Sequence, residues 1–196
     1  MVTRRRSASL PGLGPRSSAG DPVALAAAFG HRLVACEWKV VTAESCTGGL
    51  IAAALTETAG SSAWFERGFV TYSNEAKRAE LAVPAALLRA HGAVSEPVAG
   101  AMAAGALIAS RAQVAIAVTG IAGPTGAVPG KPVGTVCFGW AARGSPPVTM
   151  TRRFAGDRRA VRLATVAWAL RGAWALVDAV SRPVECGHAP GRGRRD

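Results

Sequence analysis

The pattern of apolar and polar residues along this chain alternates between the two periods of regular secondary structure. Short apolar runs, typical of strands, are separated by longer stretches in which apolar residues recur every three or four positions, as on one face of a helix. The short runs predict strands at 38–43, 68–72, 114–119, 133–142 and 148–154. The longer stretches predict helices at 22–36, 50–60, 74–81, 84–92, 97–111 and 156–180. Strands that alternate with helices predict a layered α/β domain.

Three of these segments say more about the fold. The run 114–119 is continuously apolar, which indicates a strand buried at the centre of the sheet. Segment 148–154 alternates apolar and polar residues and therefore indicates an edge or antiparallel strand. The last helix has apolar residues around much of its circumference, so we expect it to pack on the sheet, and a contact with a partner subunit stays open.

The composition indicates one folded domain with polar, basic ends. A chain of 196 residues, 49% of them apolar, is long enough for one core. Residues 1–20 predict a disordered basic leader, residues 21–180 the domain, and residues 181–196 a disordered basic tail. No apolar run approaches the ~20 residues of a membrane span, no signal-peptide pattern is present, and the four cysteines form no CxxC pair. We therefore expect a cytoplasmic protein with reduced thiols and no membrane partner.

The net charge of +11 is unevenly distributed. Residues 1–20 hold four Arg and no acid, residues 181–196 hold four Arg and two acids, and the domain keeps the remaining +5. A basic domain suits a phosphate-bearing substrate, and the basic ends predict weak binding of a polyanion as an alternative function. The domain shows no basic stripe with interleaved aromatic residues, so nucleic-acid binding is the less favoured hypothesis.

Segment 42–49, Thr-Ala-Glu-Ser-Cys-Thr-Gly-Gly, carries the first candidate chemistry. It lies between a predicted strand and an Ala/Leu/Ile-rich helix. We therefore expect Ser45, Cys46 and Thr47 at a helix N-terminus, where free N–H groups favour an anion. Gly48 and Gly49 would let a ligand approach the main chain. Either Ser45 or Cys46 is a candidate nucleophile, although Ser and Thr are equally typical of plain helix caps.

Lys77, in the segment Tyr72-Ser73-Asn74-Glu75-Ala76-Lys77, is the candidate base. The chain has only three lysines against twenty arginines, so this lysine is not simply its usual surface cation. Lysine can act as a base when burial or nearby positive charge lowers its pKa, whereas arginine cannot. A solvated helix lysine and a packed Tyr72 are the simpler structural interpretation.

Two further segments are candidates for substrate binding. One lies at the end of the central strand, where ligands of such sheets bind, and reads Thr119-Gly120-Ile121-Ala122-Gly123-Pro124-Thr125-Gly126. Its glycine spacing, GxxGxxG, fits neither a dinucleotide-binding fingerprint nor a P-loop. Asp157 is the expected N-cap of the last helix, and either Arg158 or Arg159 beside it is a candidate phosphate ligand. An ordinary Gly/Pro turn and a capped helix with solvated arginines are the competing structural explanations.

Taken together, the motifs make the chain resemble the CinA C-terminal domain family, the PncC-like nicotinamide-nucleotide amidohydrolases. The motifs occur in the family's order and span about residues 22–178. They are Ala43-Glu44-Ser45-Cys46-Thr47-Gly48-Gly49, Tyr72-Ser73-Asn74-Glu75-Ala76-Lys77, Gly92-Ala93-Val94-Ser95, Thr119-Gly120-Ile121-Ala122-Gly123-Pro124, Lys131-Pro132-Val133-Gly134-Thr135-Val136 and Gly156-Asp157-Arg158.

The resemblance implies a three-layer α/β/α sandwich with a mixed, mostly parallel sheet of about five strands, in a homo-oligomer. It implies hydrolysis of the carboxamide of nicotinamide mononucleotide to nicotinate mononucleotide and ammonia, with no metal and no organic cofactor. The family's proposed catalytic Ser, Tyr and Lys correspond to Ser45, Tyr72 and Lys77, which favours Ser45 over Cys46. The positions expected to bind the nucleotide are Cys46, Thr47, Gly48, Gly49, Thr119, Gly120, Gly123 and Arg158.

This sequence departs from the family's pattern in one loop, and two other functions compete with the amidohydrolase interpretation. Residues 125–130 read Thr-Gly-Ala-Val-Pro-Gly, where the family usually has a Gly-rich run. One competing interpretation is a non-catalytic nucleotide-binding module of the same fold, and the other is the weak polyanion binder. Release of ammonia from nicotinamide mononucleotide separates the amidohydrolase from both.

Overall fold

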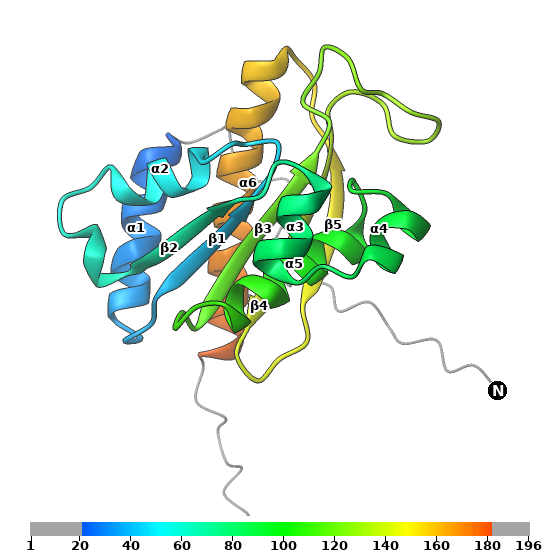
Figure 1. The fold of residues 1–196 in the computed structure, drawn as a ribbon. Helices are drawn as coiled ribbons and strands as arrows, with labels where there is room; N and C mark the ends of the chain where they lie inside the picture. The colour runs from blue at the N-terminus through cyan, green and yellow to red at the C-terminus, as the bar shows by residue number, and fades with distance from the viewer. Residues whose placement is uncertain (1–20, 182–196) are drawn as a thin grey trace, which may run out of the picture.

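The computed structural model describes residues 21–181, which form a five-stranded sheet between two layers of helices (Figure 1). The predicted leader, residues 1–20, and the predicted tail after Ser181 lie outside the described residues. The α/β/α sandwich that the resemblance implies is confirmed.

The sheet has the strand order β2-β1-β3-β4-β5. Its strands are β1 Val40–Glu44, β2 Phe65–Val70, β3 Val114–Gly120, β4 Thr135–Ala142 and β5 Val148–Arg153. β1 pairs in parallel with β2 and with β3, whereas β4 is antiparallel to both β3 and β5. The sheet is therefore mixed, and β5 is the antiparallel edge strand that its alternating pattern predicts.

Helices cover both faces of the sheet (Figure 1). The described helices are α1 Pro22–Val34, α2 Leu50–Thr56, the 3-10 turn η1 Ser61–Ala63, α3 Asn74–Leu81, α4 Ala85–His91, α5 Glu96–Ile108 and α6 Arg158–Val180. On one face α6 lies against β3 and β4 and contacts α1 and α2. On the other face α5 lies against β1, β3, β4 and β5 and contacts α3 and α4.

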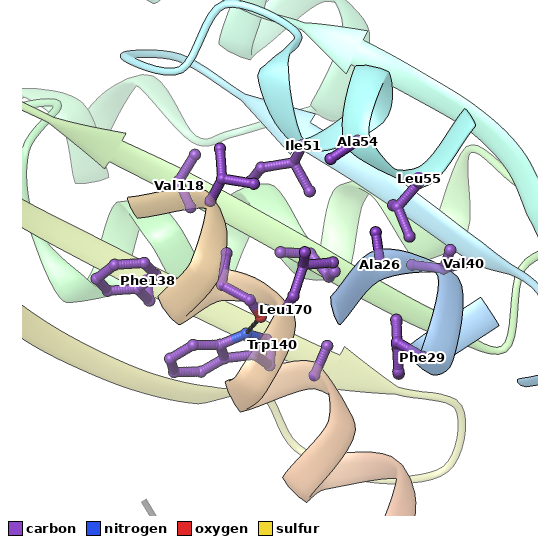
Figure 2. Close-up of a cluster of buried hydrophobic side chains, with 14 of the residues drawn as sticks. Ala26, Phe29, Val40, Ile51, Ala54, Leu55, Val118, Phe138, Trp140 and Leu170 are labelled. Carbon is purple, nitrogen blue, oxygen red and sulfur yellow. Dashed lines mark hydrogen bonds between the residues drawn. The ribbon is translucent and has the colours of Figure 1, made fainter. Parts of the chain in front are cut away.

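The larger part of the core fills the face of the sheet beneath α1, α2 and α6 (Figure 2). Ile116 and Val118 of β3 belong to this core, because alternate residues of a strand point to the same face. Trp140 of β4 stacks on Phe138 with ring centroids 5.4 Å apart, and its indole N–H donates to the carbonyl of Ala169 at 2.8 Å. This hydrogen bond joins α6 to the sheet (Figure 2).

Small residues on the opposite face allow α5 to approach the sheet closely. Ala115 and Ala117 of β3 belong to this second core. Gly139 of β4 has no room for a Cβ, which would strike the carbonyl of Ala99 on α5. β3 is thus buried on both faces, as its continuous apolar run predicts.

The apolar residues around α6 are explained by its place in the core. By length and composition alone this helix could cross a membrane. Half of its apolar stretch is buried inside the molecule, as in a helix that belongs to a protein core. Contact with β3 and β4 accounts for this burial.

The predicted start of the second strand is wrong. The pattern predicts a strand at 68–72, but β2 spans Phe65–Val70. Glu66 and Arg67, which form an ion pair at 2.7 Å, obscure the start of the strand. An edge strand that is partly exposed to water tolerates charged residues of this kind.

The predicted turn before the second helix is confirmed. The pattern predicts a strand, a tight turn and then a helix after residue 49, and α2 begins at Leu50. Gly48 and Gly49 have φ angles of +59° and +96° and hold the chain in a turn that other residues rarely adopt. Ser45 therefore lies on a turn between β1 and α2.

Candidate active site

The carboxyl ends of β1, β2 and β3 meet at one edge of the sheet because these strands are parallel. Ser45 follows β1, Lys77 lies on α3 after β2, and Thr119 and Gly120 end β3. Ligands of open α/β sheets bind outside this edge. The topology therefore brings three of the four candidate segments together, and Arg158 of the fourth reaches them from the start of α6.

Ser45 and Lys77 are in direct contact. The amine nitrogen Nζ of Lys77 lies 3.1 Å from Oγ of Ser45. The same amine donates to the main-chain carbonyls of Thr71 at 2.8 Å and Tyr72 at 3.3 Å. Lys77 is only 1% exposed and Ser45 only 8% exposed. The simpler interpretation of Lys77 as a solvated surface residue is therefore wrong.

The local sequence explains how a buried lysine comes to lie beside the serine. The hydroxyl of Ser73 accepts from the N–H of Ala76 at 3.0 Å and caps α3, so this helix starts soon after β2 ends. Lys77 and Leu81 are four residues apart and form the buried face of α3. The lysine side chain can therefore reach back to the carbonyls that follow β2.

Burial lowers the pKa of Lys77 from its ordinary value of 10.5, because removal from water disfavours the charged amine. Cys46 and Glu75 act in the opposite direction, but more weakly. A neutral amine has two N–H groups and one lone pair. The carbonyls of Thr71 and Tyr72 can accept the two N–H groups, which leaves the lone pair for the hydroxyl of Ser45. This arrangement suits transfer of a proton from Ser45 to Lys77.

Cys46, the other candidate nucleophile, is less well placed. Burial raises the pKa of its thiol to about 12, so the thiol stays protonated near neutral pH. Its sulfur packs against the main chain of Gly120, where a Cβ would come within 3.1 Å of it. The amine of Lys77 is hydrogen-bonded to Ser45 instead. The geometry therefore favours Ser45 as nucleophile.

The turn that carries Ser45 leaves two main-chain donors available. The N–H of Ser45 donates to the carbonyl of Val118 at 3.1 Å, and the N–H of Gly48 donates to the carbonyl of Ser45 at 3.0 Å. Within residues 21–181, the N–H groups of Cys46 and Thr47 donate to no other residue. These two groups are the hydrogen-bond donors that the turn can offer to a substrate.

The N-terminus of α2 is occupied by a carboxylate of the chain itself. Glu44, the last residue of β1, is fully buried. Its Oε2 accepts from the N–H groups of Gly49 at 3.1 Å and Ile51 at 3.0 Å, and its Oε1 accepts from Ala52 at 2.8 Å. The expectation of free N–H groups for an anion therefore holds only for Cys46 and Thr47, because Glu44 occupies the N–H groups at the positive end of α2.

Tyr72 lies at the surface, and its hydroxyl is bound to an arginine. Its side chain is 59% exposed, and the hydroxyl accepts from Nη2 of Arg158 at 3.0 Å. Nη1 of the same arginine donates to the carbonyl of Gly123 at 2.9 Å. The structure thus brings Tyr72, Arg158 and Gly123 together. In the described part of the chain, no hydrogen bond joins the Tyr72 hydroxyl to Ser45 or Lys77.

Arg162 is a residue of the site that the sequence motifs did not reveal. Its Nη2 donates to the carbonyl of Thr47 at 2.7 Å, and its Nε is buried without a hydrogen-bond partner among the described residues. Arg158 and Arg162 are four residues apart and so share one face of α6, a spacing that could have identified the pair from sequence. They line a pocket of about 570 Å³ together with Leu50, Asp157, Arg159 and Leu163. This pocket offers guanidinium groups to an anion beside the turn that carries Ser45.

Thr119 and Gly120 shape the site from the end of β3. The Thr119 side chain is 1% exposed, and its hydroxyl donates to the carbonyl of Ala93 at 2.9 Å. Gly120 brings its main chain against the sulfur of Cys46, so a larger residue would displace the turn. These contacts hold β3 against the segment before α5 and against the Ser45 turn.

The chemistry available at the site comes from hydroxyl, amine, guanidinium and main-chain N–H groups. Among residues 21–181, no group of three His, Cys, Asp or Glu side chains could hold a metal ion. A hydroxyl beside a buried amine suits nucleophilic attack on a carbonyl carbon, and the arginines suit an anionic substrate.

Comparisons with known proteins identify the family of this chain. The chain is 53% identical over 149 residues to nicotinamide-nucleotide amidohydrolase PncC of Enterobacter agglomerans. This match covers 76% of this chain and 91% of that protein. The chain is 54% identical over 145 residues to the protein of the same name from Escherichia coli strain K12, and this match covers 74% of this chain and 88% of that protein. The solved structure of competence/damage inducible protein CihA from Agrobacterium tumefaciens superposes with a TM-score of 0.77 at 48% identity, covering 83% of this chain and 97% of that one. The family model of the CinA C-terminal domain matches residues 23–176. The chain therefore belongs to the CinA C-terminal domain family.

Proposed function

We propose that this protein hydrolyses the carboxamide of nicotinamide mononucleotide to nicotinate mononucleotide and ammonia. Relatives at more than half identity are named nicotinamide-nucleotide amidohydrolases. The single observation that carries the proposal is the 3.1 Å contact between the buried amine of Lys77 and the hydroxyl of Ser45. In this mechanism Ser45 is the nucleophile and Lys77 is the general base.

Proton transfer starts the reaction. Neutral Lys77 accepts the hydroxyl proton of Ser45 while Oγ attacks the carboxamide carbon. A lysine with an unperturbed pKa is neutral in only about one molecule in 10³ at pH 7, so the lowered pKa of Lys77 increases the reactive fraction. The resulting ammonium group then returns its proton to the leaving nitrogen, and ammonia departs. A water molecule, deprotonated by Lys77, then attacks the acyl carbon; the bond from this carbon to Oγ breaks, and Lys77 returns the proton to Oγ, which restores Ser45 and the neutral amine.

Negative charge develops on the carboxamide oxygen during both attacks. The N–H groups of Cys46 and Thr47 lie next to the nucleophile in the chain and donate to no other described residue. We assign them to the oxyanion. Loss of one donor of this kind typically costs about 3 kcal/mol of transition-state stabilisation.

The arginine pocket suits the 5′-phosphate of the nucleotide. Arg158 and Arg162 lie on one face of α6 and line a pocket whose volume is within the usual range for ligand sites. Arg162 also contacts the carbonyl of Thr47, so this pocket and the nucleophile share one turn. A planar guanidinium can hold a phosphate through paired hydrogen bonds. In this proposal the phosphate binds at the start of α6, because Glu44 occupies the start of α2.

Tyr72 belongs to the substrate side of the site in this mechanism. The amine of Lys77 already contacts Ser45, so proton transfer between them requires no phenol as a relay. The hydroxyl of Tyr72 holds Arg158 instead. The exposed ring is therefore available to contact the nucleotide and to orient the arginine. A direct part for Tyr72 in proton transfer stays a prediction from the family resemblance.

An ammonia-release assay with three related amides tests the proposal. The compounds are nicotinamide mononucleotide, nicotinamide riboside, which lacks the phosphate, and free nicotinamide. We expect the nucleotide to be hydrolysed with the highest kcat/KM, because only it can bind the arginine pocket. Absence of ammonia from all three, together with binding of the nucleotide by calorimetry, would instead support the non-catalytic nucleotide-binding module.

A further inference from the structure

Glu44 is a buried carboxylate that the proposed mechanism does not use. It is 0% exposed, and neither ion pair of the described residues includes it. Burial of a carboxylate is unfavourable unless hydrogen bonds replace its water. Three main-chain N–H groups, those of Gly49, Ile51 and Ala52, supply these bonds at 2.8–3.1 Å.

These three bonds close a short loop around the nucleophile. Glu44 stands immediately before Ser45, and its partners begin at Gly49, so the bonds join both ends of the turn at 45–48. Within the turn, only the N–H of Gly48 donates to the carbonyl of Ser45. Gly48 and Gly49 adopt left-handed φ angles, and such residues have many alternative conformations. The turn therefore depends on contacts outside itself for a single conformation.

We infer that Glu44 is a positioning residue for the nucleophile. Its carboxylate anchors α2 to the end of β1 and so holds Oγ of Ser45 within hydrogen-bond distance of Nζ of Lys77. The same anchor orients the N–H groups of Cys46 and Thr47. This inference rests on the proposed function for the role of Ser45, but its test has a readout that does not depend on the substrate.

Glu44→Gln tests the inference with little change in size. The amide keeps one oxygen acceptor and replaces the other with an NH₂ group that cannot accept a hydrogen bond. A displacement of about 1 Å can lower a rate about 10²-fold, so we expect kcat per folded molecule to fall by about ten- to a hundredfold. KM should change little, because Glu44 does not line the arginine pocket. The apparent pKa of kcat/KM should stay at its wild-type value.

A matched control removes a charge from the other end of the same helix. The control is Glu57→Gln, at the exposed C-cap residue of α2. Its kcat per folded molecule should equal that of the wild type. A purely structural part for Glu44 predicts a lower folded fraction with unchanged kcat per folded molecule, and this result would overturn the inference. A fall in rate that is fully explained by a shifted pKa would also overturn it, because Glu44 would then act through its charge.

A serine-reactive fluorophosphonate probe separates this inference from the proposed function. Its rate of attachment to Ser45, followed by mass spectrometry, reports the nucleophile without any nucleotide. We expect Glu44→Gln to lower this rate, and labelling at the wild-type rate would overturn the inference even if the wild type releases no ammonia.

A second variant covers the case in which Glu44→Gln does not fold. Ala52→Pro removes the N–H that donates to Oε1 of Glu44, in the first turn of α2, where a proline removes no hydrogen bond within the helix. We expect the same slower labelling of Ser45, and an unchanged rate in the folded protein would contradict the inference.

Discussion

Replacing Lys77 with Met removes the amine beside Ser45 and keeps a side chain of similar length. In residues 21–181, Lys77 is the one side chain hydrogen-bonded to the Ser45 hydroxyl. A general base typically contributes about 10²- to 10⁴-fold in rate, which corresponds to about 2.7–5.4 kcal/mol of activation free energy. We expect kcat for ammonia release from nicotinamide mononucleotide to fall by at least this factor. KM should change little, because Lys77 does not line the arginine pocket.

The pH dependence of Lys77→Met gives a second, independent result. Because only the neutral amine accepts a proton, wild-type kcat/KM should rise with pH through the lowered pKa of Lys77 and level off below pH 10.5. This rise should be absent from the residual activity of Lys77→Met. An ammonia assay across the alkaline range measures both profiles.

Lys77 should also make the fold less stable at neutral pH than at alkaline pH. Its folded-state pKa lies below the unfolded value of 10.5, so the unfolded chain binds more protons between these two values. The contribution of Lys77 to the free energy of unfolding should therefore rise with pH in that window, by about 1.4 kcal/mol for each pH unit that the window spans. Lys77→Met should lose this rise, and urea unfolding at several pH values tests it.

Lys39→Met is the matched control for these measurements. Lys39 is exposed and lies just before β1, at the opposite end of this strand from Ser45, and its amine donates to the carbonyl of Ser62. Its replacement should leave kcat and both pH profiles unchanged. If Lys77→Met were as active as Lys39→Met, or kept the alkaline rise in kcat/KM, the assignment of Lys77 as base would be refuted.

Two further substitutions separate substrate binding from chemistry. Arg162→Met should raise KM for nicotinamide mononucleotide by about ten- to a hundredfold, because a charged hydrogen bond contributes about 1.5–3 kcal/mol, whereas the exposed control Arg111→Met should not. An unchanged KM in steady-state kinetics would show that the phosphate does not bind in this pocket. Cys46→Ala should keep kcat of the same order as the wild type, because the buried thiol stays protonated. Loss of ammonia release from folded Cys46→Ala would point to the thiol as nucleophile.

The fold follows closely from the sequence where apolar periodicity decides it. β3 is recognisable because it is apolar on both faces, and β5 because its residues alternate. β2 begins earlier than the predicted strand because Glu66 and Arg67 lie on a partly exposed edge, where burial does not select the residue type. The homo-oligomer stays a prediction, which light scattering in solution can test.

The site is only partly predictable for a different physical reason. Parallel strands place Ser45 and Lys77 at one edge, but sequence spacing does not show that the amine is buried within 3.1 Å of the hydroxyl. Glu44 escaped notice because a carboxylate at the end of a strand gains its partners only when the next helix folds over it. Arg162 contacts Thr47 across 115 positions, a separation that local patterns do not report. The pair spacing of Arg158 and Arg162 on α6 was the available signal.

The most direct test of the central claim is ammonia release from nicotinamide mononucleotide by the Ser45→Ala protein, measured at saturating substrate beside the wild type. With Oγ removed, the reactive pair of Ser45 and Lys77 no longer exists, while the fold, checked by circular dichroism, should persist. The mechanism predicts release at the background rate. Turnover near the wild-type rate by the folded Ser45→Ala protein would contradict it.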